Sequence, residues 1–168
     1  MFVFGHLGFG HQLASPWRRR LPALPLALGM LLPDIIDKPL YYARFSDVIS
    51  CTRTFGHSGL FWLALLLLGW TIGRRWPVAL AVGMITHIIL DFTLDLLSGS
   101  DPGVTWLALT WPLNGTAFGT VYIGSLPQHM GRLLNPWMIA AELLGLWLVI
   151  RDYRMTRPAS AAAPAPEA

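Results

Sequence analysis

Histidine and aspartate recur every four residues in THIILDFTLD, an apolar stretch that runs from residue 86 to residue 95. Residues four apart lie one turn apart on a helix, so the side chains of His87 and Asp91 would project from one face. An imidazole nitrogen and a carboxylate oxygen at this spacing can bind a divalent ion, and zinc accepts both at about 2.0–2.2 Å. An aspartate at membrane depth costs about 2.5–3.5 kcal/mol. The pair is therefore a candidate functional site.

Three other segments carry histidine or aspartate beside an apolar run. They are VFGHLGFG with His6, LLPDIIDKP with Asp34 and Asp37, and RTFGHSG with His57. If the second segment is helical, its two aspartates lie on one face, three residues apart. The whole set offers more ligands than one tetrahedral ion needs, so it is large enough for two or more ions. Such a cluster activates water and clamps the oxygens of a phosphoester during displacement.

Each of these residues also has a purely structural interpretation. A lone histidine in an apolar helix is more often a hydrogen-bonded packing residue than a metal ligand. Asp34 could cap a loop, and Asp37 could pair with a neighbouring lysine or arginine. Asp95 could orient a ligand or lie at the membrane interface. Glu142, in the apolar stretch MIAAELLGLW, is a candidate for pairing with a buried arginine.

The composition is that of an integral membrane protein. Of the 168 residues, 54% are hydrophobic and 12% are charged, against about a quarter charged in average soluble domains. The mean hydropathy is +0.52. The formal net charge of +3 is too small to indicate nucleic-acid binding, so no nucleic-acid partner is expected. The single cysteine, Cys51, excludes a disulfide within the chain and a cysteine-rich zinc site.

Five apolar segments predict an all-α fold, a polytopic membrane bundle of four or five hydrophobic helices. They cover roughly 2–15, 21–36, 57–73, 76–98 and 134–150. A helix needs about 20 apolar residues to cross the bilayer core; the fourth segment reaches this length, and the third and fifth approach it. The first two are short, so they would be tilted, re-entrant or packed against the others. The long connection 99–133 is too rich in Gly and Pro for one continuous helix.

The arginines indicate an orientation in the membrane. If segments two to five each cross once, the arginines at 18–20, 74–75, 151, 154 and 157 share one side, with eight basic residues there against four on the other. The arginine-rich side is predicted to be cytoplasmic. The His/Asp motifs then meet near the extracytoplasmic face of a bacterial inner membrane, and His6 joins them if the N-terminus lies on that side. We expect one membrane-embedded domain over 1–155 and a disordered Pro/Ala-rich tail over 156–168.

Several motifs occur in a fixed order along the chain. They are Gly5-His6, LLPDIIDKP (31–39), FGHS (55–58) and THIILDFT (86–93), followed by WPL (111–113). This ordered set resembles the YdjM-like family of bacterial inner-membrane proteins, which are regarded as metal-dependent hydrolases. The resemblance covers residues 5 to about 119. It implies a distant relation to the zinc-dependent phospholipases C and single-strand nucleases, which are all-α enzymes with a His/Asp cluster of zinc ions.

The resemblance also implies a site. Its expected metal ligands are His6, Asp34 or Asp37, His57, His87 and Asp91. They would hold a divalent metal, zinc by preference, as one to three ions. The implied reaction is phosphoester hydrolysis by a metal-activated water, with phospholipid as a natural substrate for a membrane-embedded site. The sequence departs from the soluble enzymes in one respect. Those enzymes take further His and Glu ligands from a later helix, and no second HxxxD or HxxxE motif occurs here.

Other residues are candidates for catalysis and substrate binding. Asp37 or Asp95 could accept a proton or orient a ligand, and Arg44 and Arg53 could contact the substrate phosphate. The two arginines could equally contact lipid head groups. The expected partners are membrane lipids and a phospholipid or other phosphoester substrate. Two other functions use the same residues: a small membrane transporter or ion relay, and a non-catalytic protein whose metal ties helices together.

Overall fold

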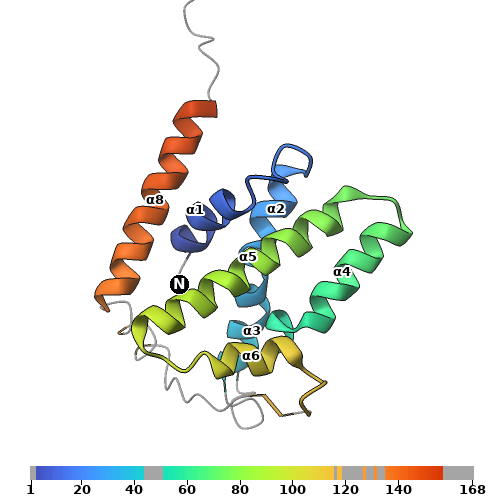
Figure 1. Cartoon of the computed structure of the whole chain (residues 1–168), viewed down its shortest axis with the longest axis vertical. Coiled ribbons are helices and arrows are strands. Elements are labelled where there is room, and N and C mark those ends of the chain that lie inside the picture. Colours follow the sequence, from blue (N-terminus) through green and yellow to red (C-terminus); the bar gives the residue numbers. More distant parts are fainter. Residues whose placement is uncertain are drawn as a thin grey trace, which may run out of the picture.

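The computed structural model describes residues 3–43, 51–115, 117–118, 127, 131 and 135–156. Within these residues the chain is all-α, as predicted, and contains no strand. Its elements are α1 (Val3–Leu13), α2 (Ala23–Gly29), α3 (Leu32–Tyr42), the 3-10 turn η2 (Phe55–His57), α4 (Gly59–Thr71), α5 (Arg75–Ser98), α6 (Gly103–Thr110) and α8 (Pro136–Thr156) (Figure 1). Arg44 and the predicted tail beyond Thr156 lie outside the described residues.

Helix α5 is the centre of the fold and packs against α1, α2, α3, α4 and α6 (Figure 1). It ends at Gly99, whose φ of 69° is the left-handed conformation that closes many helices. Among the described residues, α5 is the only helix that is both long and apolar enough to cross a membrane. It coincides with the predicted segment 76–98.

The other predicted spans form shorter or more charged helices. Helix α4 is apolar but has 13 residues. Helix α8 has 21 residues, and Glu142, Arg151 and Asp152 interrupt its apolar sequence. The described residues therefore contain one candidate membrane span, and the polytopic arrangement stays a prediction.

The predicted segment 21–36 forms two helices instead of one. Helix α2 ends at Gly29, and α3 begins at Leu32 with Pro33 in its first turn. Proline is tolerated there because a first-turn N–H has no partner within the helix. The last carbonyls of a helix likewise lack donors, and the carbonyl of Met30 at this break accepts a hydrogen bond from Nδ1 of His87 at 2.7 Å. The break thus supplies one contact of the candidate site.

Glycines allow two pairs of helices to touch through their backbones. A Cβ placed on Gly83 would lie 2.3 Å from the carbonyl oxygen of Leu26, where α5 crosses α2. A Cβ on Gly8 would lie 2.2 Å from the carbonyl oxygen of Gly145, where α1 crosses α8. Small residues at helix crossings are typical of membrane proteins, in which van der Waals packing holds the helices together. These crossings determine how close α1 and α2 lie to their partners.

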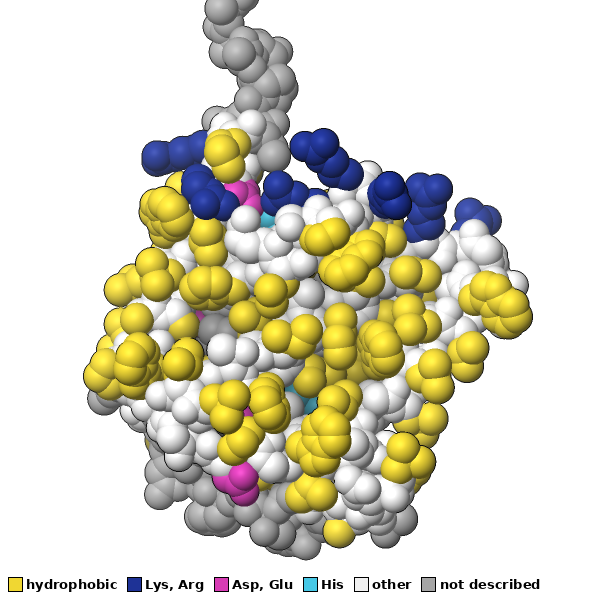
Figure 2. All heavy atoms as spheres, in the orientation of Figure 1, with side chains coloured by type: hydrophobic (Ala, Val, Ile, Leu, Met, Phe, Trp, Pro, Cys, Tyr) yellow, Lys and Arg dark blue, Asp and Glu magenta, His cyan; other side chains and the backbone are white. Residues whose placement is uncertain are grey.

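Lysine and arginine side chains gather at one end of the face shown in Figure 2, and hydrophobic side chains spread over the rest of it. Two contacts join distant segments at this end. Nη1 of Arg75 donates to the carbonyl oxygen of Arg20 at 3.4 Å, and Nη1 of Arg18 lies 3.5 Å from Oδ2 of Asp152. The start of α5, the connection between α1 and α2, and the end of α8 therefore share one end of the molecule.

Candidate metal centre

Three buried histidines from three elements meet at Asp91 of α5. Nε2 of His6, from α1, lies 3.4 Å from Oδ1 of Asp91. Nε2 of His57, from η2, and Nε2 of His87, from α5, lie 3.6 and 3.7 Å from its Oδ2. The three imidazoles and the carboxylate are each at most 5% exposed. The predicted convergence of His6, His57, His87 and Asp91 is present in the structure.

The hydrogen bonds around these rings determine which ring nitrogens present lone pairs to the carboxylate of Asp91. Nδ1 of His57 lies 2.7 Å from Oδ2 of Asp37, and Nδ1 of His87 lies 2.7 Å from the carbonyl oxygen of Met30. Both partners are acceptors, so Nδ1 carries the proton in each neutral ring and Nε2 presents a lone pair. Within the described residues, no Nε2 of the three histidines has a hydrogen-bond partner.

A cation bound between the Nε2 atoms and the carboxylate would compensate these unpaired lone pairs. Buried lone pairs that face carboxylate oxygens without a donor are costly. Ligand atoms that share a tetrahedral zinc at about 2.0–2.1 Å lie about 3.4 Å from one another. The separations of 3.4–3.7 Å between the three Nε2 atoms and Asp91 are close to this value. The residues present therefore fit a divalent metal ion.

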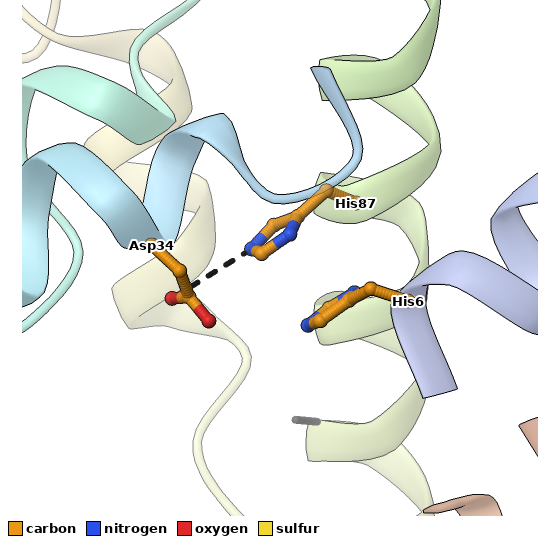
Figure 3. Close-up of side chains that lie close together, drawn as sticks. All are labelled: His6, Asp34 and His87. Atoms are coloured by element: carbon orange, nitrogen blue, oxygen red, sulfur yellow. Dashed lines mark ion pairs between the residues drawn. The ribbon is translucent and has the colours of Figure 1, made fainter. Parts of the chain in front are cut away.

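Asp34 belongs to a second group of candidate metal ligands, which overlaps the group around Asp91. Figure 3 shows its carboxylate directed from α3 toward the rings of His87 and His6, and its Oδ1 lies 3.9 Å from Nε2 of His87. The rings of His6 and His87 are stacked, with centroids 3.7 Å apart. Donor atoms of His6, Asp34 and His87 lie within 4.8 Å of one another, as do those of His57, His87 and Asp91. Because His87 presents one lone pair, the two groups are overlapping positions that compete for it.

Asp37 lies behind His57. Its two oxygens accept four hydrogen bonds, from the backbone N–H of Thr54 at 2.6 Å, its hydroxyl at 2.8 Å, the N–H of Gly56 at 2.8 Å and Nδ1 of His57 at 2.7 Å. Burial alone would raise the pKa of Asp37, but these hydrogen bonds hold it below its ordinary value. All four lone pairs of the carboxylate are used. Asp37 therefore orients His57, as carboxylates commonly do behind metal-binding histidines.

Arg53 pairs with both Asp91 and Asp95, the two carboxylates of α5 in this centre. Its Nε donates to Oδ2 of Asp91 at 3.1 Å, Nη1 and Nη2 both donate to Asp95, and Nη1 also donates to the hydroxyl of Thr105. Burial alone would lower the pKa of Arg53, but Asp91 and Asp95 raise it above its ordinary value. Asp95 thus contacts Arg53 and Thr105. The phosphate contacts expected of Arg53 and of Arg44 stay predictions.

Three partners in the centre were not predicted. Met30 contributes only its backbone carbonyl, which no side-chain pattern reveals. Thr105 belongs to α6, inside the stretch 99–133, whose Gly and Pro content predicts an irregular connection. Thr54 directly precedes the FGHS motif, and its position beside a predicted ligand is the one signal that could have identified a partner.

A comparison with known proteins gives the chain a family. No curated protein and no solved structure is similar enough to match it. The family model described as YdjM inner membrane protein matches residues 1–158. This match extends beyond both ends of the motif-bearing region, residues 5 to about 119. The relation to phospholipases C and single-strand nucleases stays a prediction. The chain belongs to the YdjM inner membrane protein family.

Proposed function

We propose that the protein is a membrane-bound, metal-dependent hydrolase of phosphoesters. Its metal centre would be formed by His57, His87 and Asp91 together with the overlapping group of His6, Asp34 and His87. The observation that carries this proposal is the set of three buried Nε2 atoms that face carboxylate oxygens with no donor between them. Zinc is the proposed ion because imidazole and carboxylate are among its preferred ligands. Asp34 is proposed as a further ligand on the more exposed side.

The proposed chemistry divides between the ion and the chain. A divalent ion in such a centre lowers the pKa of a water molecule to about 7 and polarises a phosphoryl oxygen. Asp37 and the carbonyl of Met30 turn the Nε2 lone pairs of His57 and His87 toward the ion. Asp95 acts through Arg53, which holds Oδ2 of Asp91. The roles proposed for Asp37 and Asp95 are therefore orienting roles.

The open side of the centre offers groups for a proton and for a phosphate. Asp34 is 18% exposed, the largest value among the carboxylates near the histidines. Its Oδ2 accepts a hydrogen bond from Nζ of Lys38, one helical turn away. We assign proton acceptance to Asp34 and contact with an anionic phosphate to Lys38. Arg53 is less suited to that contact because it already makes four hydrogen bonds.

A groove beside η2 supports a substrate with a hydrocarbon chain, such as a phospholipid. It encloses about 370 Å³, and its largely apolar lining includes Phe55, Phe61 and Trp111. Gly56 also lines the groove and is the chain neighbour of His57. A lipid whose phosphoester lies at the metal centre could therefore extend its chain along the neighbouring groove.

The proposed location is the extracytoplasmic half of a bacterial inner membrane, in a multi-pass protein. Its support is the cluster of basic side chains at one end (Figure 2), which is predicted to be cytoplasmic. Asp91 follows Arg75 of that end by 16 residues on the same helix, or about 24 Å at 1.5 Å per residue. This distance lies beyond the middle of a hydrocarbon core about 30 Å thick.

One observation favours a second candidate function, a structural metal that ties helices together. The three histidines are 0–1% exposed, and they come from α1, η2 and α5. A closed site of this kind is typical of structural zinc. The distinguishing feature is Asp34, whose partial exposure gives the centre a more open side.

The experiment that tests the proposal begins with bound metal. Protein purified in mild detergent after growth with zinc should contain the metal, and the double variant His87→Ala/Asp91→Ala should lack it. Thr93→Ala, an exposed position on the same helix, is the matched control. Turnover of a short-chain and a long-chain phosphodiester is then compared, and the long chain should be preferred. If the wild type binds metal but turns over neither substrate, the structural function is favoured over hydrolysis. If the wild type binds no metal, both the hydrolase and the structural metal site are refuted.

A further inference from the structure

Glu142 is a carboxylate in an apolar stretch of α8, where an acidic side chain is costly without a partner. Its partner is the start of another helix. Oε2 accepts a hydrogen bond from the backbone N–H of Phe4, and Oε1 accepts one from the N–H of Gly5, both at 3.0 Å. The first N–H groups of a helix have no acceptor within it and form the positive end of its dipole. Glu142 thus caps α1 from α8.

The residue after this cap is His6, whose ring is held differently from the other two. His57 and His87 each have Nδ1 bonded to an acceptor. Within the described residues neither ring nitrogen of His6 has a hydrogen-bond partner, although the residue is 1% exposed. Its ring stacks on that of His87. The position of His6 therefore depends on where α1 itself lies.

Helix α1 is attached chiefly to α8 (Figure 1). Between their two ends, the Gly8–Gly145 crossing leaves no room for a side chain. At the far end of α1, Asp152 of α8 accepts hydrogen bonds from Nδ1 of His11 at 2.8 Å and from Nε2 of Gln12 at 2.6 Å. Two carboxylates of α8 thus hold the two ends of α1, and Glu142 holds the end that carries His6.

We propose that Glu142 is a positioning residue of the metal centre. By binding the N–H groups of Phe4 and Gly5, it sets the depth and rotation of α1 so that Nε2 of His6 reaches Asp91. A one-residue shift of the cap would turn α1 by about 100° and remove the ring from the centre. The inference rests on the proposed metal binding and does not require hydrolysis.

The test is a cycle of zinc affinities, measured in detergent by competition with a chromogenic chelator. Glu142→Gln removes the negative charge and replaces one of the two acceptor oxygens with an NH₂ group. That group cannot accept the hydrogen bond that Phe4 or Gly5 donates. Residues that orient metal ligands typically contribute 10–100-fold in affinity, so Glu142→Gln should weaken zinc binding by about tenfold or more. In the His6→Ala background the same substitution should have no further effect, because the ligand it positions is already gone.

The matched control is the His57→Ala background, in which Glu142→Gln should still weaken binding by its full factor. Equal losses in the His6→Ala and His57→Ala backgrounds would overturn the proposal, because they would indicate a general disturbance of the fold. An unchanged affinity in the single variant would also overturn it. Failure of the wild type to bind zinc is a separate result, which would refute the proposed metal centre and this inference together.

Discussion

His57 and Asp37 form a pair shielded from solvent, in which Nδ1 of the histidine lies 2.7 Å from Oδ2 of the aspartate. The same carboxylate accepts three further hydrogen bonds from Thr54 and Gly56. It therefore joins α3 to the turn that carries His57. Because the pair is fully buried, a change in it affects both the stability of the turn and the direction of the imidazole lone pair.

The substitution Asp37→Asn should destabilise the protein strongly. An amide group presents N–H donors where the carboxylate had only acceptors, so at least one of the four donors around it loses its partner. Each buried donor left unpaired costs about 1–3 kcal/mol. Thermal unfolding in detergent should show the loss. An exposed acidic residue, Asp101→Asn, serves as the control, and a similar melting temperature for both variants would contradict the assignment.

Asp37 should also contribute a pH-dependent stability. Its pKa is lower in the folded protein than its ordinary value, so the unfolded chain binds the proton more readily. The contribution is complete above the ordinary pKa of aspartate, about 3.9, and is lost as the pH falls through the lower pKa of the folded state. The difference in unfolding free energy between the wild type and Asp37→Asn should therefore shrink below about pH 4. If this difference in unfolding free energy grows on acidification instead, the prediction is wrong.

Arg53→Gln should be more harmful alone than together with Asp95→Asn. The single change leaves the buried carboxylates of Asp91 and Asp95 without their common cation, and breaking a buried ion pair costs about 3–5 kcal/mol. Removing the charge of Asp95 as well relieves part of this cost. The unfolding free energies of the wild type, the two single variants and the double variant form a double-mutant cycle that measures this coupling. Simple additivity of the two losses would show that the residues act independently.

Removal of metal should lower stability, and zinc should restore it. An ion that binds only the folded state contributes about 2.7 kcal/mol when its free concentration is 100 times the dissociation constant. The melting temperature should therefore fall with a chelator and rise again with zinc in the wild type and in Thr93→Ala. His87→Ala should show neither change. A zinc response that persists in His87→Ala would place the ion elsewhere.

The residues on regular spacings were the predictable part of the centre. His87 and Asp91 follow from the helical repeat, and the association of His6, Asp34 and His57 with them follows from four motifs that share one predicted side of the membrane. The single long helix over 76–98 was equally evident from its apolar length, and α5 confirms it.

The partners that orient these residues could not be predicted in the same way. Met30 takes part because the chain breaks between α2 and α3, and the prolines there indicate a break without revealing where the freed carbonyl points. The choice of Asp37 for His57 and of Arg53 for Asp91 depends on the path of the chain into η2. That path is set by close packing, in which a Cβ on Gly56 would lie 2.6 Å from the carbonyl of Pro33.

The dependence of α1 on α8 has a consequence for biosynthesis. His6 is the first proposed ligand to leave the ribosome. The N–H groups of Phe4 and Gly5, just before it, bind Glu142 of α8, the last helix that the structure describes. If zinc binds as proposed, its loading should therefore be a late event that awaits insertion of α8. Nascent chains arrested before residue 136 should contain every proposed ligand and yet retain zinc more weakly than chains released after α8.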